Sequence, residues 1–168
     1  MIYLITFPCY GSHMHGAPEG SVNRYHNRYG DPFAQPNPGL LGAELRQMDQ
    51  PPYEMDEPRR QAAMEGIVDR CARHDWQLIA VHVRSNHVHI MVGAEGKPEF
   101  VTQLKSAASR RLNVLGFDHQ ARKRWARHGS TRRLFSPESV QGAIRYVLEG
   151  QGEPMSTFLI DRSRRSRF

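Results

Sequence analysis

The segment from residue 76 to residue 93 constrains the fold most, because it is typical of two strands joined by a two-residue turn. Both halves are rich in β-branched residues, and the intervening Ser85-Asn86 suits a short hairpin turn. Side chains alternate between the faces of a strand, so His87 and His89 share one face while the apolar residues around them share the other. The segment therefore predicts an antiparallel hairpin with one apolar face and one face that carries histidines.

Two imidazoles on one strand face can bind a single metal ion. With a two-residue turn, His82 lies opposite His89 and adds a third histidine to that face. A His-x-His pair also occurs on the solvated face of many half-buried strands. His87 and His89 are therefore candidate metal ligands, and the sequence leaves open whether His82 is a bystander, a substrate contact or a direct participant.

The other expected elements are one strand, one insertion and three helices. β-Branched and aromatic residues predict a strand over residues 1–9, and apolar residues at helical spacing predict the helices. The insertion is rich in Gly, Pro, Asn and Tyr, so we expect it to be irregular. The helices are expected at residues 58–74, 98–115 and 136–150, and the insertion at residues 10–57. This order indicates an α+β fold, with helices on one face of an antiparallel sheet and the histidines on the other.

Length and composition indicate which class of protein this is. The 168 residues predict one domain over residues 1–168, with a mobile Ser/Arg tail at residues 161–168. No run approaches the roughly 20 apolar residues of a membrane helix, and no signal-peptide pattern opens the chain. Cys9 and Cys71 lack metal-type spacing and are expected to be reduced thiols. We therefore expect a cytoplasmic protein that has no membrane partner.

The charge balance favours nucleic acid as a partner. Lys and Arg outnumber Asp and Glu by 23 to 17, which gives a net charge of +6. Most of the excess is arginine in the second half of the chain, and arginine suits phosphate because its planar guanidinium can pair two oxygens at once. A basic solvated surface would give the same count, so charge alone does not establish nucleic-acid binding.

The last expected helix carries a tyrosine away from its apolar stripe. The stripe has the i, i+3, i+4, i+7, i+8 spacing of a core face. It consists of Val140, Ala143, Ile144, Val147 and Leu148. Tyr146 lies about 130° from the centre of this stripe, at about 100° per residue, so it is not ordinary core filling. Tyr146 is therefore a surface aromatic residue, part of an interface, or a functional residue.

Four segments of the chain carry a resemblance to a known family. They are residues 86–92 (Asn-His-Val-His-Ile-Met-Val), residues 144–151 (Ile-Arg-Tyr-Val-Leu-Glu-Gly-Gln), the basic residues 123–130 between them, and the opening strand at residues 3–7. In these segments the sequence resembles the HUH single-strand DNA endonucleases, specifically the IS200-like single-tyrosine transposases and the REP-associated tyrosine transposases. The resemblance spans most of the chain outside the insertion and the tail.

The resemblance implies a ferredoxin-like, RRM-like fold and a DNA nicking and rejoining reaction. It assigns Tyr146 as the nucleophile, which attacks single-stranded DNA and forms a 5′-phosphotyrosine link with release of a 3′-hydroxyl. It assigns His87 and His89 as ligands of a divalent metal ion, Mg²⁺ or Mn²⁺. Imidazole-rich sites have higher intrinsic affinity for Zn²⁺, Ni²⁺ or Cu²⁺, so a purified sample could carry another ion.

The third metal ligand is where this chain departs from the family. Relatives often have Gln or Asn four residues after the tyrosine, one helical turn further on. Here that position is Gly150, which has no side chain. Gln151 is the best substitute if the helix unwinds at Gly150, and Glu149 is the alternative.

The resemblance also implies a DNA partner that combines hairpins with flanking single strands. Arginines in the second half are the expected phosphate contacts. They are Arg110, Arg111, Arg122, Arg124, Arg127, Arg132 and Arg133. Tyr25, Tyr29 and Phe33 of the insertion could stack on unpaired bases, or pack within the loop. Some relatives are homodimers that exchange tyrosine helices and others act as monomers, and the sequence favours neither.

The sequence is consistent with three functions. The first is a metal-dependent transposase that nicks and rejoins DNA, for its own gene or for the host. The second is a DNA-binding protein of the same fold that has lost cleavage, an idea motivated by Gly150. The third is an unrelated metal-dependent phosphoesterase that uses His82, His87 and His89, for which Tyr146 would be dispensable.

Overall fold

The structure, a computed structural model, describes residues 1–12, 14–18, 34–96 and 99–160. Its elements in chain order are β1 (Ile2–Pro8), α1 (Pro38–Gln47), α2 (Glu57–Arg73), β2 (Gln77–Val83), β3 (His87–Gly93), α3 (Phe100–Val114), β4 (Ser130–Leu134), α4 (Pro137–Leu148) and β5 (Ser156–Leu159). Among these residues, no helix has both the length and the apolar character that crossing a bilayer requires.

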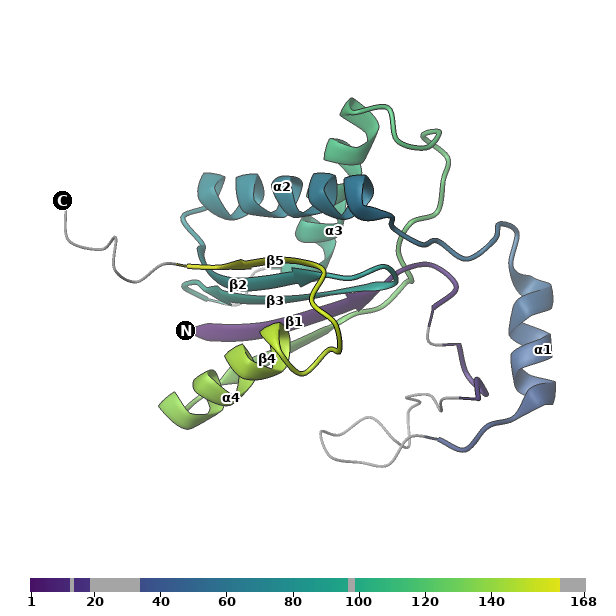
Figure 1. Cartoon of the computed structure of the whole chain (residues 1–168), viewed down its shortest axis with the longest axis horizontal. Coiled ribbons are helices and arrows are strands. Elements are labelled where there is room, and N and C mark those ends of the chain that lie inside the picture. Colours follow the sequence, from purple (N-terminus) through teal and green to yellow (C-terminus); the bar gives the residue numbers. More distant parts are fainter. Residues whose placement is uncertain (13, 19–33, 97–98, 161–168) are drawn as a thin grey trace.

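The strands form one antiparallel sheet in the order β4-β1-β3-β2-β5. Figure 1 shows α2 and α3 on one side of this sheet and α4 on the other. The predicted α+β class, the antiparallel sheet and the hairpin of β2 and β3 are confirmed. The histidines lie on the face opposite α2 and α3, as predicted, but they share that face with α4.

The larger core lies between the sheet and the helices α2 and α3. Phe7 of β1, Ile67 of α2 and Leu104 of α3 are all fully buried there. The two helices approach closely at Gly66, where an added Cβ would lie 2.7 Å from the carbonyl oxygen of Ala107. This core fixes β1 against β3, and it thereby sets the register of the residues that point to the opposite face.

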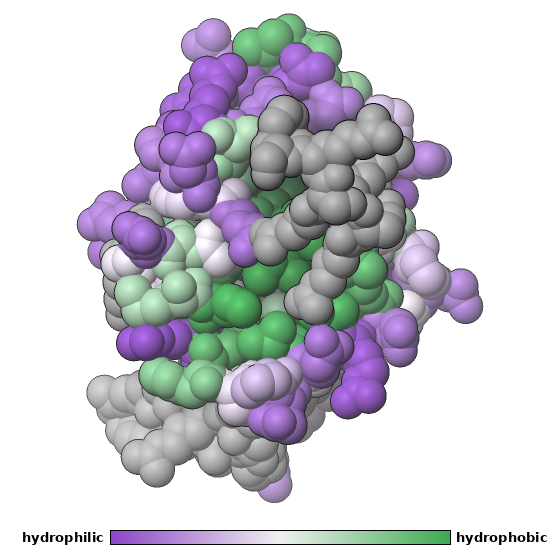
Figure 2. Space-filling view, turned by 90° about the vertical axis from the view of Figure 1, so that its left-hand side faces the viewer, coloured by the Kyte–Doolittle hydropathy of each residue, from purple (hydrophilic) through white to green (hydrophobic). Residues whose placement is uncertain are grey.

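The smaller core lies under α4. Its buried members are Ile79, Ala80, Met91, Leu134, Ala143 and Val147. Figure 2 looks at the end of the molecule where β1 begins, and it shows apolar side chains gathered in the middle of that end with hydrophilic ones around them. Because α4 packs on the sheet through this core, its C-terminal turn is held beside the histidines of β3.

Local sequence signals explain where α4 begins. Ser136 accepts a hydrogen bond from the Ser139 N–H, and the Ser139 side chain accepts one from the Ser136 N–H, which forms a capping box. Pro137 occupies the first turn, where its missing N–H costs nothing. The predicted start is confirmed, whereas the helix ends at Leu148 rather than at Gly150.

Three elements were not expected from the sequence. Helix α1 lies inside the insertion, so the prediction of irregular structure is wrong for residues 38–47. The helix has no buried residue, and its local signals are the Asn37 cap and Pro38. The edge strands β4 and β5 are short and largely exposed, so they lack the alternation of a half-buried strand. The tail at residues 161–168 lies outside the described residues.

Candidate active site

His87 and His89 lie on the same face of β3, next to the hairpin turn. The centroids of their rings are 4.7 Å apart. The predicted two-residue turn is confirmed, since the Arg84 N–H donates to the His87 carbonyl across the turn at 2.9 Å. In the register of the sheet, His89 lies opposite Thr6 of β1 on one side and His82 of β2 on the other.

Each of the two imidazoles has an oxygen beside its Nδ1. The Thr6 Oγ1 lies 2.8 Å from His89 Nδ1, and the Asn86 Oδ1 lies 2.6 Å from His87 Nδ1. An amide oxygen can only accept, so His87 Nδ1 donates to Asn86 Oδ1. The Thr6 hydroxyl can donate or accept, so it suits either tautomer of His89.

Gln151 faces both histidines with its side-chain oxygen. Its Oε1 lies 3.0 Å from His89 Nε2 and 3.4 Å from His87 Nε2. Its amide nitrogen donates to the Tyr146 carbonyl at 3.1 Å, which fixes the orientation of the amide. Of the two predicted third ligands, Gln151 is the one that contacts the histidines, whereas Glu149 is exposed at the helix C-cap.

The helix ends early because the chain turns at Gly150. The Gly150 N–H lies within hydrogen-bond distance of two carbonyls, those of Arg145 at 3.1 Å and Tyr146 at 3.2 Å. A Cβ at Gly150 would lie 3.0 Å from the Tyr146 carbonyl oxygen and 3.3 Å from Cδ2 of the Tyr146 ring. The absence of a side chain thus allows this tight turn, which brings Gln151 to the histidines.

Tyr146 lies at the edge of the same group. Its ring packs edge-on against His89, with centroids 5.3 Å apart and an interplanar angle of 74°. The side chain is 44% exposed, whereas its neighbours Ala143 and Val147 are buried. The position of Tyr146 away from the apolar stripe agrees with the sequence analysis. The structure therefore brings the predicted nucleophile, histidine pair and third ligand together within one chain.

His82 has a different environment, although it shares the histidine face. It is fully buried; its Nδ1 lies 2.8 Å from the Val147 carbonyl, and its Nε2 accepts from the Met155 N–H at 3.1 Å. Both ring nitrogens are therefore engaged by the main chain. This geometry corrects the expectation that His82 could join His87 and His89 as a third ligand.

Burial and the neighbouring His87 lower the pKa of His89 to about 3. The imidazole is therefore neutral at physiological pH, which is the form that binds metal ions. Two imidazole nitrogens and one amide oxygen thus converge as Lewis bases, so these donors fit a divalent cation. Within the described residues there is no group of three His, Cys, Asp or Glu side chains that could hold a metal ion.

The predicted phosphate contacts do not form one surface. Arg124 is only 4% exposed and donates to Asp118, Asn113 and the Phe117 carbonyl, so its predicted role as a DNA contact is wrong. Its positive charge stabilises the fold instead.

Three other arginines also have partners within the protein. Arg110 donates to Ser106, and Arg111 pairs with Glu65 at 2.7 Å, both on helix α3 away from the histidine face. Arg122 donates to the carbonyls of Pro51 and Pro52. These contacts already engage guanidinium N–H groups of Arg110, Arg111 and Arg122, so fewer of them can donate to a phosphate.

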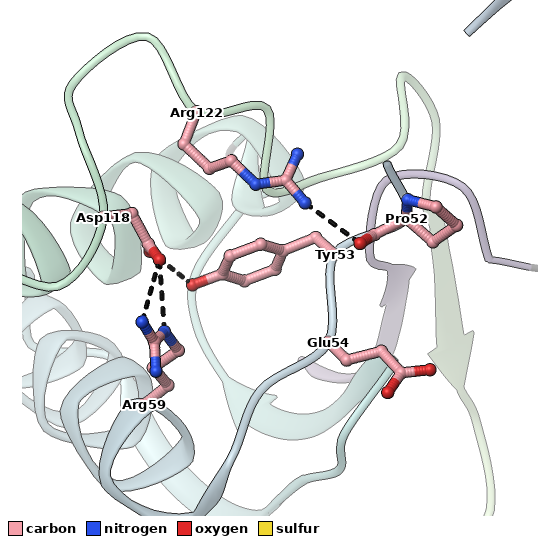
Figure 3. A pocket seen from close by; sticks show the side chains of 6 residues that line it. All are labelled: Pro52, Tyr53, Glu54, Arg59, Asp118 and Arg122. Carbon is pink, nitrogen blue, oxygen red and sulfur yellow. Dashed lines mark hydrogen bonds and ion pairs between the residues drawn. The ribbon is translucent and has the colours of Figure 1, made fainter. Parts of the chain in front are cut away.

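An open hollow of about 460 Å³ is lined by the residues labelled in Figure 3, which are Pro52, Tyr53, Glu54, Arg59, Asp118 and Arg122. The Tyr53 hydroxyl donates to Asp118 at 2.7 Å, Arg59 pairs with the same carboxylate at 3.1 Å, and the Arg122 guanidinium lies over the ring. Because internal partners engage these charges, the hollow is better explained as part of the fold than as a phosphate site.

The remaining arginines are exposed and lie near the edge strand β4. Arg132 lies opposite Leu4 in the register of β1 and β4. The Leu4 side chain packs on the smaller core, so Arg132 lies on the histidine face. Arg133 pairs with Tyr3 of the larger core and lies on the opposite face, and Arg127 precedes the strand. The three insertion aromatics at positions 25, 29 and 33 lie outside the described residues.

Sequence reasoning missed Thr6 and Asn86 as partners of the two imidazoles. Asn86 could have been found, because it directly precedes His87 in the sequence. Thr6 could not, because its place beside His89 depends on the register between β1 and β3.

Comparison with known proteins places these residues in context. The chain matches the family model described as "Transposase IS200 like" over residues 55–145, more than half of its length. The matched range includes His87 and His89 and ends one residue before Tyr146. The comparison with curated proteins found no match.

Two solved structures are similar to this chain. The REP-associated tyrosine transposase bound to a REP hairpin is 11% identical, with a TM-score of 0.48 over 88% of this chain and 64% of that chain. A candidate transposase from Deinococcus radiodurans R1 is 15% identical, with a TM-score of 0.45 over 90% of each chain. The chain thus spans 64% of the length of the REP-associated protein.

Proposed function

Because the chain belongs to the IS200-like transposase family, we propose that it nicks and rejoins single-stranded DNA with Tyr146 as the nucleophile. The observation that carries this proposal is the convergence of Tyr146, His87, His89 and Gln151 at one end of the sheet. The histidines come from a strand and the other two residues from the end of a helix and the turn after it, so the fold itself assembles the group.

The proposed metal ligands are His87 Nε2, His89 Nε2 and Gln151 Oε1. A bound divalent ion, Mg²⁺ or Mn²⁺ in the cell, would polarise the scissile phosphate and stabilise the charge that develops during displacement. Asn86 and Thr6 orient the imidazoles through their Nδ1 atoms, and such outer partners raise the affinity of histidine ligands.

The phenol oxygen of Tyr146 forms a bond to the phosphorus, and the bond from phosphorus to the 3′ oxygen breaks. The phenol loses its proton, and the departing 3′ oxygen gains one to become a free hydroxyl. The 5′-phosphotyrosine link keeps the phosphodiester bond energy, so a second 3′-hydroxyl can attack and release the tyrosine. A phenolate, with an ordinary pKa of about 10, is a better leaving group than an alkoxide.

The Tyr146 ring contacts His89 of its own chain, so the site we propose does not need an exchange of tyrosine helices between two copies to be complete. The DNA partner we propose is a single strand next to a hairpin. Arg132 on the histidine face and the exposed Arg127 are the best candidates among the predicted arginines to contact its phosphates. The position of Gln151 beside the histidines supplies an oxygen that Gly150 lacks, which supports cleavage over the alternative of a protein that only binds DNA.

The test incubates the protein and Mn²⁺ or Mg²⁺ with labelled single-stranded DNA that carries the hairpins flanking its gene. We expect an adduct that survives SDS and that is absent in Tyr146→Phe and His87→Ala. Tyr10→Phe is a matched control, because the Tyr10 hydroxyl contacts Asp49 rather than the histidines. DNA binding without any adduct, with both metals and several hairpins, would instead indicate a protein that only binds DNA.

A further inference from the structure

We propose that His82 is a positioning residue that fixes Tyr146 and Gln151 relative to the histidine pair; this inference rests on the function proposed above. The His82 imidazole binds both ends of the segment that joins α4 to β5, at Val147 and Met155. That segment contains Gln151 and begins directly after the turn of helix that carries Tyr146.

The two contacts define the state of the ring. The Val147 carbonyl can only accept, so His82 Nδ1 donates to it at 2.8 Å. The Met155 N–H can only donate, so His82 Nε2 accepts from it at 3.1 Å. His82 is therefore a neutral imidazole with its proton on Nδ1, and it is fully buried. Neither nitrogen is left for a metal ion or for DNA.

The ring connects β2, which is paired with the strand of the proposed ligands, to the rest of the site. His82 lies directly opposite His89 in the register of β2 and β3, so its backbone is fixed relative to the metal ligands. Through Val147 it holds the last turn of α4, and through Met155 it holds the far end of the Gln151 turn. Arg84, directly after β2, adds one further contact, to the Glu153 carbonyl at 2.9 Å.

The segment between these anchors has no regular secondary structure, since residues 149–151 form a turn and residues 152–155 are irregular. Its position therefore depends on specific contacts rather than on a helix or strand ladder. A rigid ring with a donor and an acceptor on its two nitrogens satisfies both main-chain groups at once. Leucine would fill much of the same space and satisfy neither, which would leave both ends of the segment without their anchor.

A double-mutant cycle on Mn²⁺ affinity separates positioning from general stability. We expect His82→Leu and Gln151→Ala each to weaken Mn²⁺ binding by about tenfold, and the double variant to lose little more than the stronger single one. Electron paramagnetic resonance of free Mn²⁺ gives the affinity, and thermal unfolding checks the fold. His119→Leu, at an exposed histidine, is the matched control. Wild-type affinity in His82→Leu, or effects that simply multiply, would overturn the proposal.

A measurement on the unaltered protein keeps the proposal testable if His82→Leu does not fold. Nitrogen-15 NMR of the histidine rings should show His82 as the neutral Nδ1–H form, unchanged when Mg²⁺ is added. A proton on Nε2, or a response to Mg²⁺ like that of His87, would contradict the assignment. If the unaltered protein binds no Mn²⁺ and forms no adduct, the proposed function fails, while this NMR measurement still decides the state of His82.

Discussion

The side-chain amide of Gln151 donates to the main-chain carbonyl of Tyr146 across 3.1 Å, which ties the proposed third ligand to the proposed nucleophile. The same contact turns Gln151 Oε1 toward His89 Nε2, 3.0 Å away. A spacing of five residues would place two side chains on different faces of a continuous helix. Here the two side chains lie on the same side because α4 ends at Leu148 and the chain turns at Gly150.

Removing the Gln151 side chain should weaken metal binding. Gln151→Ala takes away a side-chain oxygen that lies beside both imidazoles, so we expect Mn²⁺ affinity to fall by about tenfold. Gln151→Glu should retain an oxygen donor and bind Mn²⁺ at least as well as the wild type. Isothermal titration measures both, with Gln141→Ala on the exposed side of α4 as the control. Unchanged affinity in Gln151→Ala would exclude Gln151 as a ligand.

The Thr6 hydroxyl should contribute to metal affinity through His89. Thr6→Val keeps the shape of the side chain but removes the partner of His89 Nδ1, so Mn²⁺ affinity should fall by about tenfold. Thr6→Ser retains the hydroxyl and should bind Mn²⁺ like the wild type. Equal affinities in the valine and serine variants would show that the hydroxyl has no role in orienting the ring.

Arg132 should contact DNA phosphate, whereas Arg111 should not. Arg132 lies on the histidine face, and Arg111 is paired with Glu65 on α3. Arg132→Ala should therefore weaken binding and reduce the slope of log affinity against log salt by about 0.7 for a single strand. Fluorescence anisotropy over a salt series measures the slope. If Arg111→Ala loses as much DNA affinity as Arg132→Ala, the DNA does not bind only on the histidine face.

Asp118 should make the fold sensitive to acid. Burial raises the pKa of Asp118, but hydrogen bonds from Tyr53, Arg124 and Arg59 outweigh it, so the net pKa is below the usual value. The unfolded chain therefore takes up this proton first as the pH falls. The resulting stabilisation is complete above the usual pKa of about 3.9, and it is lost as the pH falls through the lower folded value.

The variant Asp118→Asn tests whether the stabilisation by Asp118 decreases as the pH falls. At pH 7 its free energy of unfolding should be about 2 kcal/mol lower than that of the wild type, because charged hydrogen bonds are lost. Below about pH 4 the difference should shrink, since the wild type then loses the same charge. Urea denaturation at a series of pH values measures both, and a difference that stays constant with pH would show that the charge of Asp118 is not responsible.

The sequence predicted the features that depend on local pattern. Alternation in residues 76–93 predicted the hairpin, and the apolar stripe of the last helix predicted that Tyr146 lies off the core. Ser136 and Pro137 predicted the start of α4. These signals were readable because each depends on neighbours within a few residues of the chain.

Features that depend on distant contacts were not readable. Arg124 looks like any other arginine of the basic segment, yet Asp118 and Asn113 bury it. The sequence allowed His82 as a ligand, but its two nitrogens contact Val147 at the end of α4 and Met155 just before β5. In both cases the side chain's role depends on which distant backbone or carboxylate the fold brings beside it.

Tyr146 is the residue that we propose forms the covalent link to DNA. Mass spectrometry of the adduct after nuclease and protease digestion identifies the linked residue. We expect a 5′-phosphonucleotide on the tyrosine of the peptide that contains Tyr146, and none in Tyr146→Phe. A nucleotide attached to another residue, or an adduct that persists in Tyr146→Phe, would show that Tyr146 is not the nucleophile.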